Sequence, residues 1–332
     1  MSTSRSPEIK PAEPTESTMR AITLESFEDA PGLREVPKPE IAADEVLVRV
    51  HASSVNGFDG AVATLMAKEY YEYEFPVTLG ADLAGVIEQI GPEVSRYSVG
   101  DEVFGFIFRP SLHHGSWADY VSVPESWFIA PKPKSLGFLE AGALPLAGVS
   151  ALLAVEAVSP SEGDRVLVVG ATGGVGGYAV QLAAARGATV IATTRPDDEA
   201  RLRELGAAET IDFTRHDVAA VRERYPDGVQ GLIDLVNFAD GFAAVAELVA
   251  PGGHAASTLG AANVEELSAR NITAANIMTS PDPALLARLA QHADAGRLRV
   301  TIDSTFPLEE ALDGLTAFGR GKRGKLAVSV VP

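Results

Sequence analysis

A glycine-rich loop carries the clearest chemical signal in the sequence. The apolar run 166–169 leads into Gly170-Ala171-Thr172-Gly173-Gly174-Val175-Gly176-Gly177, and an alanine-rich stretch of helical character follows. Glycine allows a tight turn and lets bare backbone N–H groups approach a ligand closely. The N-terminus of the following helix adds roughly half a positive charge, so the loop suits a diphosphate.

Six residues of this loop are therefore predicted to contact a dinucleotide. They are Ala171, Thr172, Gly173, Gly174, Val175 and Gly176. Read from Ala171, the loop has the form A-x-G-x-x-G, so only the last two glycines of the usual fingerprint stand in place. The alternative is a tight strand-to-helix turn without a ligand. The position of the loop between a strand and a helix favours the dinucleotide.

The end of the next predicted strand indicates which dinucleotide the loop would hold. NAD-specific proteins place Asp or Glu about 20 residues after the glycines, where it binds the ribose 2′-hydroxyl. Here the strand 189–194 ends in Thr193 and Thr194, and Arg195 follows. Hydroxyl groups and a guanidinium suit a 2′-phosphate, so we predict NADPH, with Thr194 and Arg195 as contacts. The alternative is that Arg195 only begins the next helix.

These residues need a parallel sheet to position them, and the segment from 165 to about 279 has the right pattern. Apolar strand candidates at 166–170, 189–194, 231–236 and 254–260 alternate with helical stretches. This alternation predicts a parallel sheet with helices on both faces. Residues 19–122 instead form short strands between turns, and the tail from 281 has one helix and strand candidates at 297–302 and 325–331. The fold class is therefore α/β, with a second, β-rich domain.

Composition limits the classes of function. A chain of 332 residues, 46% apolar and 22% charged, has material for two domains. The net charge of −18 opposes binding to nucleic acid or to an anionic membrane surface. No run of about 20 apolar residues occurs, so no membrane-spanning helix is predicted. Residues 1–18 are rich in Ser, Thr, Pro and Glu and lack a signal peptide's apolar core, which predicts a disordered extension on a cytoplasmic protein.

Metal and thiol chemistry is disfavoured as well. The chain has no cysteine, which excludes disulfides, thiolate metal ligands and a cysteine nucleophile. Its six histidines are scattered and form no HExxH pattern. The adjacent pair His113 and His114 is not expected to bind metal, because sequence neighbours rarely point at one ion. No metal site is predicted.

Motifs in sequence order over residues 19–332 resemble those of the medium-chain dehydrogenase/reductase superfamily, in its quinone oxidoreductase (zeta-crystallin-like) branch. They are VRVHASSVNGFD, FPVTLGADLAGVIEQIG, VGDEVFGF, GSWADYVSVPE, ALPLAGVSAL, the glycine-rich loop, and FPLEEALDGL followed by GKRGKLAVSV. The resemblance implies a GroES-like β-rich catalytic domain, built from 19–143 and 281–332. It implies a central Rossmann domain with a doubly wound parallel sheet at 144–280, which binds NADPH.

The resemblance further implies a zinc-independent reductase. Zinc-dependent relatives bind catalytic zinc through a Cys and a His-Glu pair, and these positions correspond to Asn56 and to Ala81 and Asp82. Without a metal ion to activate an alcohol, an acceptor that is easier to reduce is favoured, so we expect hydride transfer from NADPH to a quinone or a conjugated enone or enal. Two alternatives stay open: a double-bond reductase or tailoring enzyme of secondary metabolism, and a dinucleotide-binding protein with little turnover.

Several residues around the nicotinamide are implied by the same resemblance. Asn56 matches an Asn that faces the nicotinamide, and a Tyr that follows shortly after it is either Tyr70 or Tyr71. Ser150 stands where relatives have a Thr near the nicotinamide amide. Asp59 is expected to cap the helix that follows it.

The remaining candidates lie later in the chain. Four of them are expected at the carboxyl ends of strands, where ligands bind in open α/β sheets. These four are Asn237, Phe238, Leu259 and Gly260. Lys325 matches a common Gly-Lys element and is expected to pack rather than to catalyse. Residues 276–278 are expected in an edge strand that many relatives pair across a dimer, so a homodimer is predicted.

Overall fold

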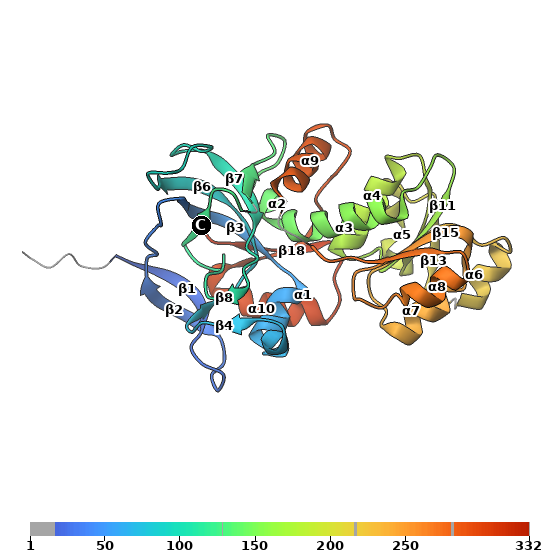
Figure 1. The fold of residues 1–332 in the computed structure, drawn as a ribbon, viewed down its shortest axis with the longest axis horizontal. Coiled ribbons are helices and arrows are strands. Elements are labelled where there is room, and N and C mark those ends of the chain that lie inside the picture. Colours follow the sequence, from blue (N-terminus) through green and yellow to red (C-terminus); the bar gives the residue numbers. More distant parts are fainter. Residues whose placement is uncertain (1–16, 128, 216–217, 280–281, 332) are drawn as a thin grey trace, which may run out of the picture.

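The computed structural model describes residues 17–127, 129–215, 218–279 and 282–331. They form a β-rich half and a half built on a parallel sheet, with helix α3 (Pro145–Val158) at the junction (Figure 1). Most of the predicted N-terminal extension lies outside the described residues. Thr18, the last residue of the predicted extension, belongs to the first strand, β1 (Thr18–Leu24). The domain limits at 143/144 and 280/281 stay predictions.

The β-rich half contains one large sheet and two small ones. The large sheet has the order β10-β7-β6-β3-β18-β17, with β9 paired to β3. Its strands are β3 (Glu45–Val55), β6 (Asp82–Ile90), β7 (Glu102–Phe106), β9 (Tyr120–Pro124), β10 (Ile129–Pro131), β17 (Ile302–Pro307) and β18 (Lys325–Ser329). The small sheets are formed by β1 (Thr18–Leu24), β2 (Gly32–Pro37) and β5 (Val77–Thr78), and by β4 (Glu72–Tyr73) and β8 (Ser111–Leu112).

The C-terminal strand β18 lies in the same sheet as strands from the N-terminal part of the chain. It pairs antiparallel with β3, and Leu326 lies opposite Val55. Figure 1 places β18 near the junction of the two halves. This register brings Lys325, the first residue of β18, to the end of β3, where the chain turns into α1 (Gly57–Ala63).

Six parallel strands form the sheet of the second half, in the order β13-β12-β11-β14-β15-β16. They are β11 (Arg165–Val169), β12 (Thr189–Thr194), β13 (Glu209–Asp212), β14 (Val229–Asp234), β15 (Val249–Ser257) and β16 (Thr273–Asn276). The order reverses between β11 and β14, and a crevice at the carboxyl ends of the strands is expected at such a reversal. The predicted α/β fold with a doubly wound parallel sheet is confirmed.

Helices cover both sheets. Those of the parallel-sheet half are α3, α4 (Gly174–Ala184), α5 (Glu199–Glu204), α6 (Val218–Arg224), α7 (Ala239–Ala246) and α8 (Val264–Ala269). The others are α1, α2 (Phe138–Ala143), α9 (Pro283–Asp294) and α10 (Ala311–Gly319), with short 3-10 helices at Met66–Glu69, Pro196–Asp198 and Leu308–Glu310. The helical stretch from 138 to 158 is divided at Pro145, because proline supplies no backbone N–H and begins a new helix.

Two other elements differ from the sequence prediction. The strand predicted at 297–302 begins only at Ile302, because the backbone N–H of Arg299 donates to the side chain of Gln181 in α4 at 2.7 Å. The edge strand predicted to include 276–278 ends at Asn276, so Met278 lies beyond it.

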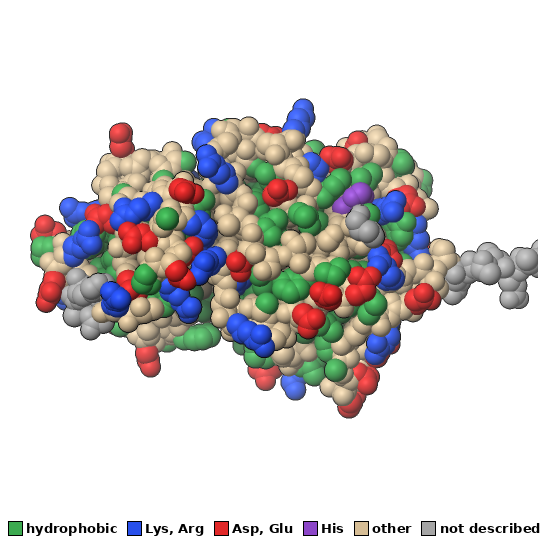
Figure 2. All heavy atoms as spheres, turned by 180° about the vertical axis from the view of Figure 1, so that it is seen from behind, with side chains coloured by type: hydrophobic (Ala, Val, Ile, Leu, Met, Phe, Trp, Pro, Cys, Tyr) green, Lys and Arg blue, Asp and Glu red, His purple; other side chains and the backbone are tan. Residues whose placement is uncertain are grey.

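One buried cluster extends from β7 and α2 through α3 and α4 to α9, and it joins the two halves through apolar contacts. On the face shown in Figure 2, acidic and basic side chains are interspersed. Within the described ranges, no helix is long and apolar enough to cross a bilayer.

Candidate functional site

The glycine-rich loop connects β11 to α4, and close contacts explain its glycines. Gly170 has φ of 85°, in the left-handed region that favours glycine. A Cβ atom at Gly176 would lie 2.3 Å from the carbonyl oxygen of Gly170, and one at Gly174 would lie 2.5 Å from Cδ of Lys325. The loop therefore presents backbone rather than side chains at the start of α4. Such a helix N-terminus can bind a diphosphate.

A cavity of about 420 Å³ lies beside this loop. Its lining includes Gly170, Thr172, Thr193, Phe213 and Asn237, and most of the remaining lining is aliphatic. Thr193 also accepts a hydrogen bond from the N–H of Gly170 at 3.0 Å, which joins the loop to β12. An apolar cavity of this size with a few polar groups suits the adenosine part of a dinucleotide.

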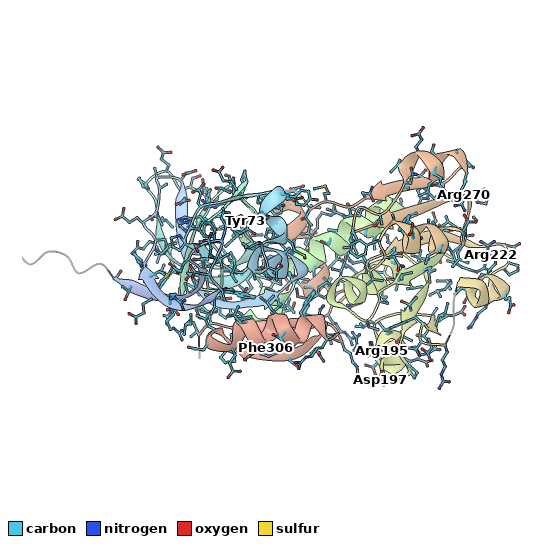
Figure 3. The ribbon with its side chains drawn as sticks, turned by 90° about the horizontal axis from the view of Figure 1, so that it is seen from below. Tyr73, Arg195, Asp197, Arg222, Arg270 and Phe306 are labelled. Carbon is cyan, nitrogen blue, oxygen red and sulfur yellow. The ribbon has the colours of Figure 1, made fainter. Side chains whose placement is uncertain are left out.

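A second cavity of about 330 Å³ continues from Thr172 and Arg195 toward the C-terminal segment. Lys322 and Arg323 line it, although they come from the loop before β18. Arg323 forms an ion pair with Asp197, which Figure 3 shows next to Arg195. Lys322 lies over the ring of Phe318, and burial lowers its pKa to about 8. Three basic side chains from two parts of the chain therefore line this cavity, together with the carboxylates of Asp197, Asp198 and Asp303.

The predicted contact Thr194 has a different role from Arg195. Its side chain is buried, and its hydroxyl donates to the carbonyl oxygen of Arg195 at 2.9 Å. It therefore stabilises the end of β12. Arg195 lies over the ring of Phe213 and lines the second cavity.

A buried polar cluster lies where β3, β6 and β18 meet. Asp82 is fully buried, and its Oδ2 accepts hydrogen bonds from Ser54 at 2.6 Å and from the Asn56 side chain at 2.9 Å. Its Oδ1 accepts from the backbone N–H of Leu146 at 2.8 Å. The ammonium of Lys325 donates to Oδ1 of Asn56 at 2.5 Å and lies 3.5 Å from Oδ2 of Asp82. A charged pair thus holds the predicted residue Asn56 from both ends of its amide.

Asp59 supports the same segment from the other side. Its carboxylate accepts from the backbone N–H of Asn56 at 2.7 Å and from that of Ala81 at 2.9 Å. Asp59 is predicted to cap a helix that follows it, but α1 already begins at Gly57, so Asp59 lies in the first turn of α1. From there its carboxylate reaches back to the backbone N–H of the N-cap residue Asn56. Burial raises the pKa of Asp59 to about 7, although both N–H groups favour the charged form.

Three aromatic rings meet beside this segment. Phe58, Tyr71 and Phe108 form a triangle with centroid separations of 5.5, 5.8 and 5.7 Å. Of the two tyrosines that the sequence left open, Tyr71 is half-buried in this triangle, and burial raises its pKa. Tyr70 is 80% exposed. The structure therefore places only Tyr71 next to the Asn56 segment.

Of the other predicted contacts, one lies within α3 and four follow the carboxyl ends of strands. The hydroxyl of Ser150 donates to the carbonyl oxygen of Leu146 within α3 at 2.9 Å. Asn237 follows the end of β14, and its side chain donates to Asp234 at 2.8 Å. Phe238 begins α7 and is 76% exposed. Leu259 and Gly260 follow the end of β15, rather than ending the strand as predicted.

His113 and His114 line a separate cavity of about 580 Å³ in the β-rich half. Their rings are 4.2 Å apart, and burial lowers the pKa of His114 to about 4. Among the residues that the structure describes, no group of three or more His, Asp or Glu side chains could hold a metal ion.

Three basic residues of this region are not among the predicted contacts. Lys322 and Arg323 line the second cavity, and Lys325, for which only packing is predicted, donates to Asn56. Their signal was the short basic run GKRGK before the last strand. Nothing local in that run indicates that it lies between the glycine-rich loop and Asn56.

Comparison with known proteins gives two family matches and close overall similarity. Residues 42–134 match the Alcohol dehydrogenase GroES-like domain, and residues 174–280 match the Zinc-binding dehydrogenase domain. The chain is 31% identical to the mitochondrial NAD(P)H oxidoreductase RTN4IP1 of Mus musculus over 334 residues, covering 87% of this chain and 82% of that protein. It is also 31% identical to 2-methylene-furan-3-one reductase of Solanum lycopersicum over 306 residues, with 90% and 74% covered.

A solved structure agrees with these sequence relatives. The quinone oxidoreductase from Coxiella burnetii superimposes with a TM-score of 0.85 at 29% identity, covering 95% of this chain and all of that one. The similarity includes both halves of the molecule, so the glycine-rich loop and the β-rich half that faces it are parts of one shared fold.

Proposed function

Because this chain is an enzyme of the medium-chain dehydrogenase/reductase superfamily, in its quinone oxidoreductase branch, we propose that it transfers hydride from NADPH to a quinone or a conjugated enone or enal. One observation supports this most strongly. The β-bridge between Gly173 and Gly324 brings the predicted diphosphate loop against the segment that leads into β18, whose Lys325 holds Asn56. A dinucleotide bound to this loop would thus lie next to the buried polar cluster around Asn56 and the aromatic triangle beside it.

The residues at the zinc position of relatives do not fit a zinc ion. Asn56 replaces a thiolate ligand, and both ends of its amide are hydrogen-bonded. Both oxygens of Asp82 are occupied by Ser54, Asn56 and Leu146. The ammonium of Lys325 already supplies a positive charge there, and a second cation would be repelled by it. We derive no catalytic step through a metal.

The protein's part in the reaction is to bind, orient and exclude water. When bound, NADPH supplies the hydride. The N–H groups at the start of α4 would hold the diphosphate, and the closely packed Asn56 segment would keep the acceptor near it. The rings of Phe58, Tyr71 and Phe108 would cover one side of a flat, apolar acceptor and keep water out. A proton from solvent completes the reduction of the acceptor.

The preference for NADPH is proposed from charge. Arg195, Lys322 and Arg323 line the cavity that continues from the glycine-rich loop. Asp197 is partly neutralised by Arg323, and Asp198 is held by Arg201 at 2.6 Å. Asp303 also lines the cavity and lies close enough to Lys322 to favour its charged form. The guanidinium and ammonium groups of this cavity are the groups that could bind a 2′-phosphate.

Calorimetry and turnover assays test this proposal. Purified protein should bind NADPH more tightly than NADH and oxidise NADPH with members of a panel of quinones and conjugated enals, and a chelator should leave the rate unchanged. Arg195→Ala should weaken NADPH about tenfold and NADH little, because roughly one charged contact is lost. Arg222→Ala is the matched control, since Arg222 is an exposed arginine on α6 (Figure 3). If neither dinucleotide binds, the proposal is wrong.

A homodimer remains a proposal of the same kind. β16 is the outer strand of the six-stranded sheet, and Met278 just after it is 78% exposed. Pairing of two such edges would cover both. Light scattering should give twice the 34.8 kDa mass of the chain, whereas a monomer at micromolar concentration would contradict the proposal. Cytoplasmic residence stays a prediction.

A further inference from the structure

Lys325 is an almost fully buried lysine that touches both parts of the proposed site. Its side chain is 2% exposed, and its ammonium donates to Oδ1 of Asn56 at 2.5 Å and to the carbonyl oxygen of Val55 at 3.3 Å. Oδ2 of Asp82 lies 3.5 Å away. A buried charge needs such partners, and here they all belong to the end of β3 and the start of β6.

This arrangement selects one of the two orientations of the Asn56 amide. The oxygen faces the ammonium of Lys325, and the nitrogen donates to Asp82 at 2.9 Å. In the flipped orientation the NH₂ group would face the ammonium, and the amide oxygen would face the carboxylate. Both contacts would be repulsive, so the charged pair holds Asn56 in one state.

The stem of Lys325 contacts the glycine-rich loop. A Cβ atom at Gly174 would lie 2.5 Å from Cδ and 2.9 Å from Cγ of Lys325, so only glycine leaves room for the lysine there. The preceding residue is tied to the same loop, because the N–H of Gly324 donates to the carbonyl oxygen of Thr172 at 2.8 Å. One residue therefore links the diphosphate loop to Asn56.

We propose that Lys325 is a positioning residue, which sets the orientation of Asn56 and the spacing between the segment 56–58 and the diphosphate loop. The inference rests on the proposed function, because it takes the segment 56–58 to lie against the acceptor. Phe58 of the aromatic triangle belongs to this segment. Loss of Lys325 thus disturbs the acceptor side of the site while the N–H groups of α4 stay in place.

The test separates positioning from simple charge compensation. Lys325→Met alone leaves Asp82 as an unpaired buried charge, so we expect a lower melting temperature and a lower kcat. The double variant Lys325→Met/Asp82→Asn removes both charges. Its melting temperature should return toward that of the wild type, and its Kd for NADPH should stay within about threefold. Its kcat should remain at least about tenfold low, because a misplacement of reacting groups by about 1 Å can cost roughly a hundredfold.

A matched control and a readout without turnover complete the test. Lys132→Met removes another lysine, whose side chain is 8% exposed and whose ammonium pairs with Glu102 at 3.2 Å, and it should lower stability but not kcat. Amide hydrogen exchange at 55–60 should be faster in the double variant than in the wild type. If kcat recovers together with stability, or exchange at 55–60 is unchanged, the positioning role is wrong. A wild type without turnover refutes the proposed function, while the exchange experiment still decides the role of Lys325.

Discussion

Replacing Gly176 with alanine places a methyl group against backbone that has little room to move. The added Cβ atom would lie 2.3 Å from the carbonyl oxygen of Gly170 and 2.5 Å from the Cα atom of Ala171. Cβ atoms essentially never lie within 3.0 Å of another heavy atom, so the loop or the start of α4 must shift. Both carry the N–H groups proposed to bind the diphosphate.

The expected loss of affinity follows from that shift. Crowding of a well-packed site costs about 1–3 kcal/mol, and one lost hydrogen bond to a charged group costs about 1.5–3 kcal/mol. Each 1.4 kcal/mol changes Kd by a factor of ten, so Gly176→Ala should raise the Kd for NADPH roughly 10- to 100-fold. Isothermal titration calorimetry measures this Kd, and urea unfolding without NADPH measures any loss of stability separately.

Gly177→Ala is the matched control, one residue further along the same helix. Its Cβ atom would lie 3.5 Å from Cδ1 of Leu205 and 3.7 Å from Nη1 of Arg201, which are ordinary contacts. We expect a Kd within about twofold of the wild type and a stability up to about 1 kcal/mol higher, because alanine favours a helix more than glycine does. Equal behaviour of the two variants would refute the reasoning about Gly176.

Three further predictions concern charge and the aromatic triangle. Burial raises the pKa of Asp59 to about 7, so folding takes up a proton above pH 4. The free energy of unfolding, measured in urea, should therefore fall by roughly 3 kcal/mol from pH 5 to pH 8. Asp59→Asn should remove this part of the pH dependence of stability. Lys322→Ala should raise the Kd for NADPH about tenfold but not the Kd for NADH. The affinity of the wild type for NADPH should decline as pH rises through about 8, where Lys322 loses its charge. An equal loss of affinity for NADPH and NADH in the variant would contradict this prediction. Tyr71→Ala should raise KM for a quinone several-fold, whereas Tyr70→Ala should not, because Tyr70 is exposed. The same effect in both variants would show that the aromatic triangle does not contact the acceptor.

Local patterns explain why the parallel-sheet half could be predicted from the sequence. Strands such as 166–169 are short apolar runs, and Gly176 is required by a contact with Gly170 in the same loop. The position of Arg195 directly after β12 follows from the same alternation of strands and helices. Periodicity and turn chemistry act over distances that the sequence displays directly.

The polar cluster depends on pairing between distant parts of the chain. Lys325 and Val55 are 270 residues apart, and the antiparallel pairing of β18 with β3 brings them together. The pairing register of two strands so far apart cannot be inferred from a single sequence. From the sequence alone, Lys325 therefore resembles an ordinary packing residue. The sequence leaves Tyr70 and Tyr71 as alternatives for a related reason, because a 3-10 helix that ends at Glu69 determines which of the two neighbours turns inward.

The burial of Lys325 is difficult to explain by stability alone. Removing a lysine and a carboxylate from water costs several kcal/mol per ion, and a buried pair often contributes no more than apolar residues of the same volume would. Burial lowers the pKa of Lys325, while Asp82 and Asp59 oppose that shift. An apolar side chain could fill the space beside Gly174, but it could not hold the amide of Asn56 in one orientation. The charged pair of Lys325 and Asp82 is therefore better explained by the orientation that it imposes on Asn56 than by a contribution to stability. The double variant that lacks both charges distinguishes these two explanations.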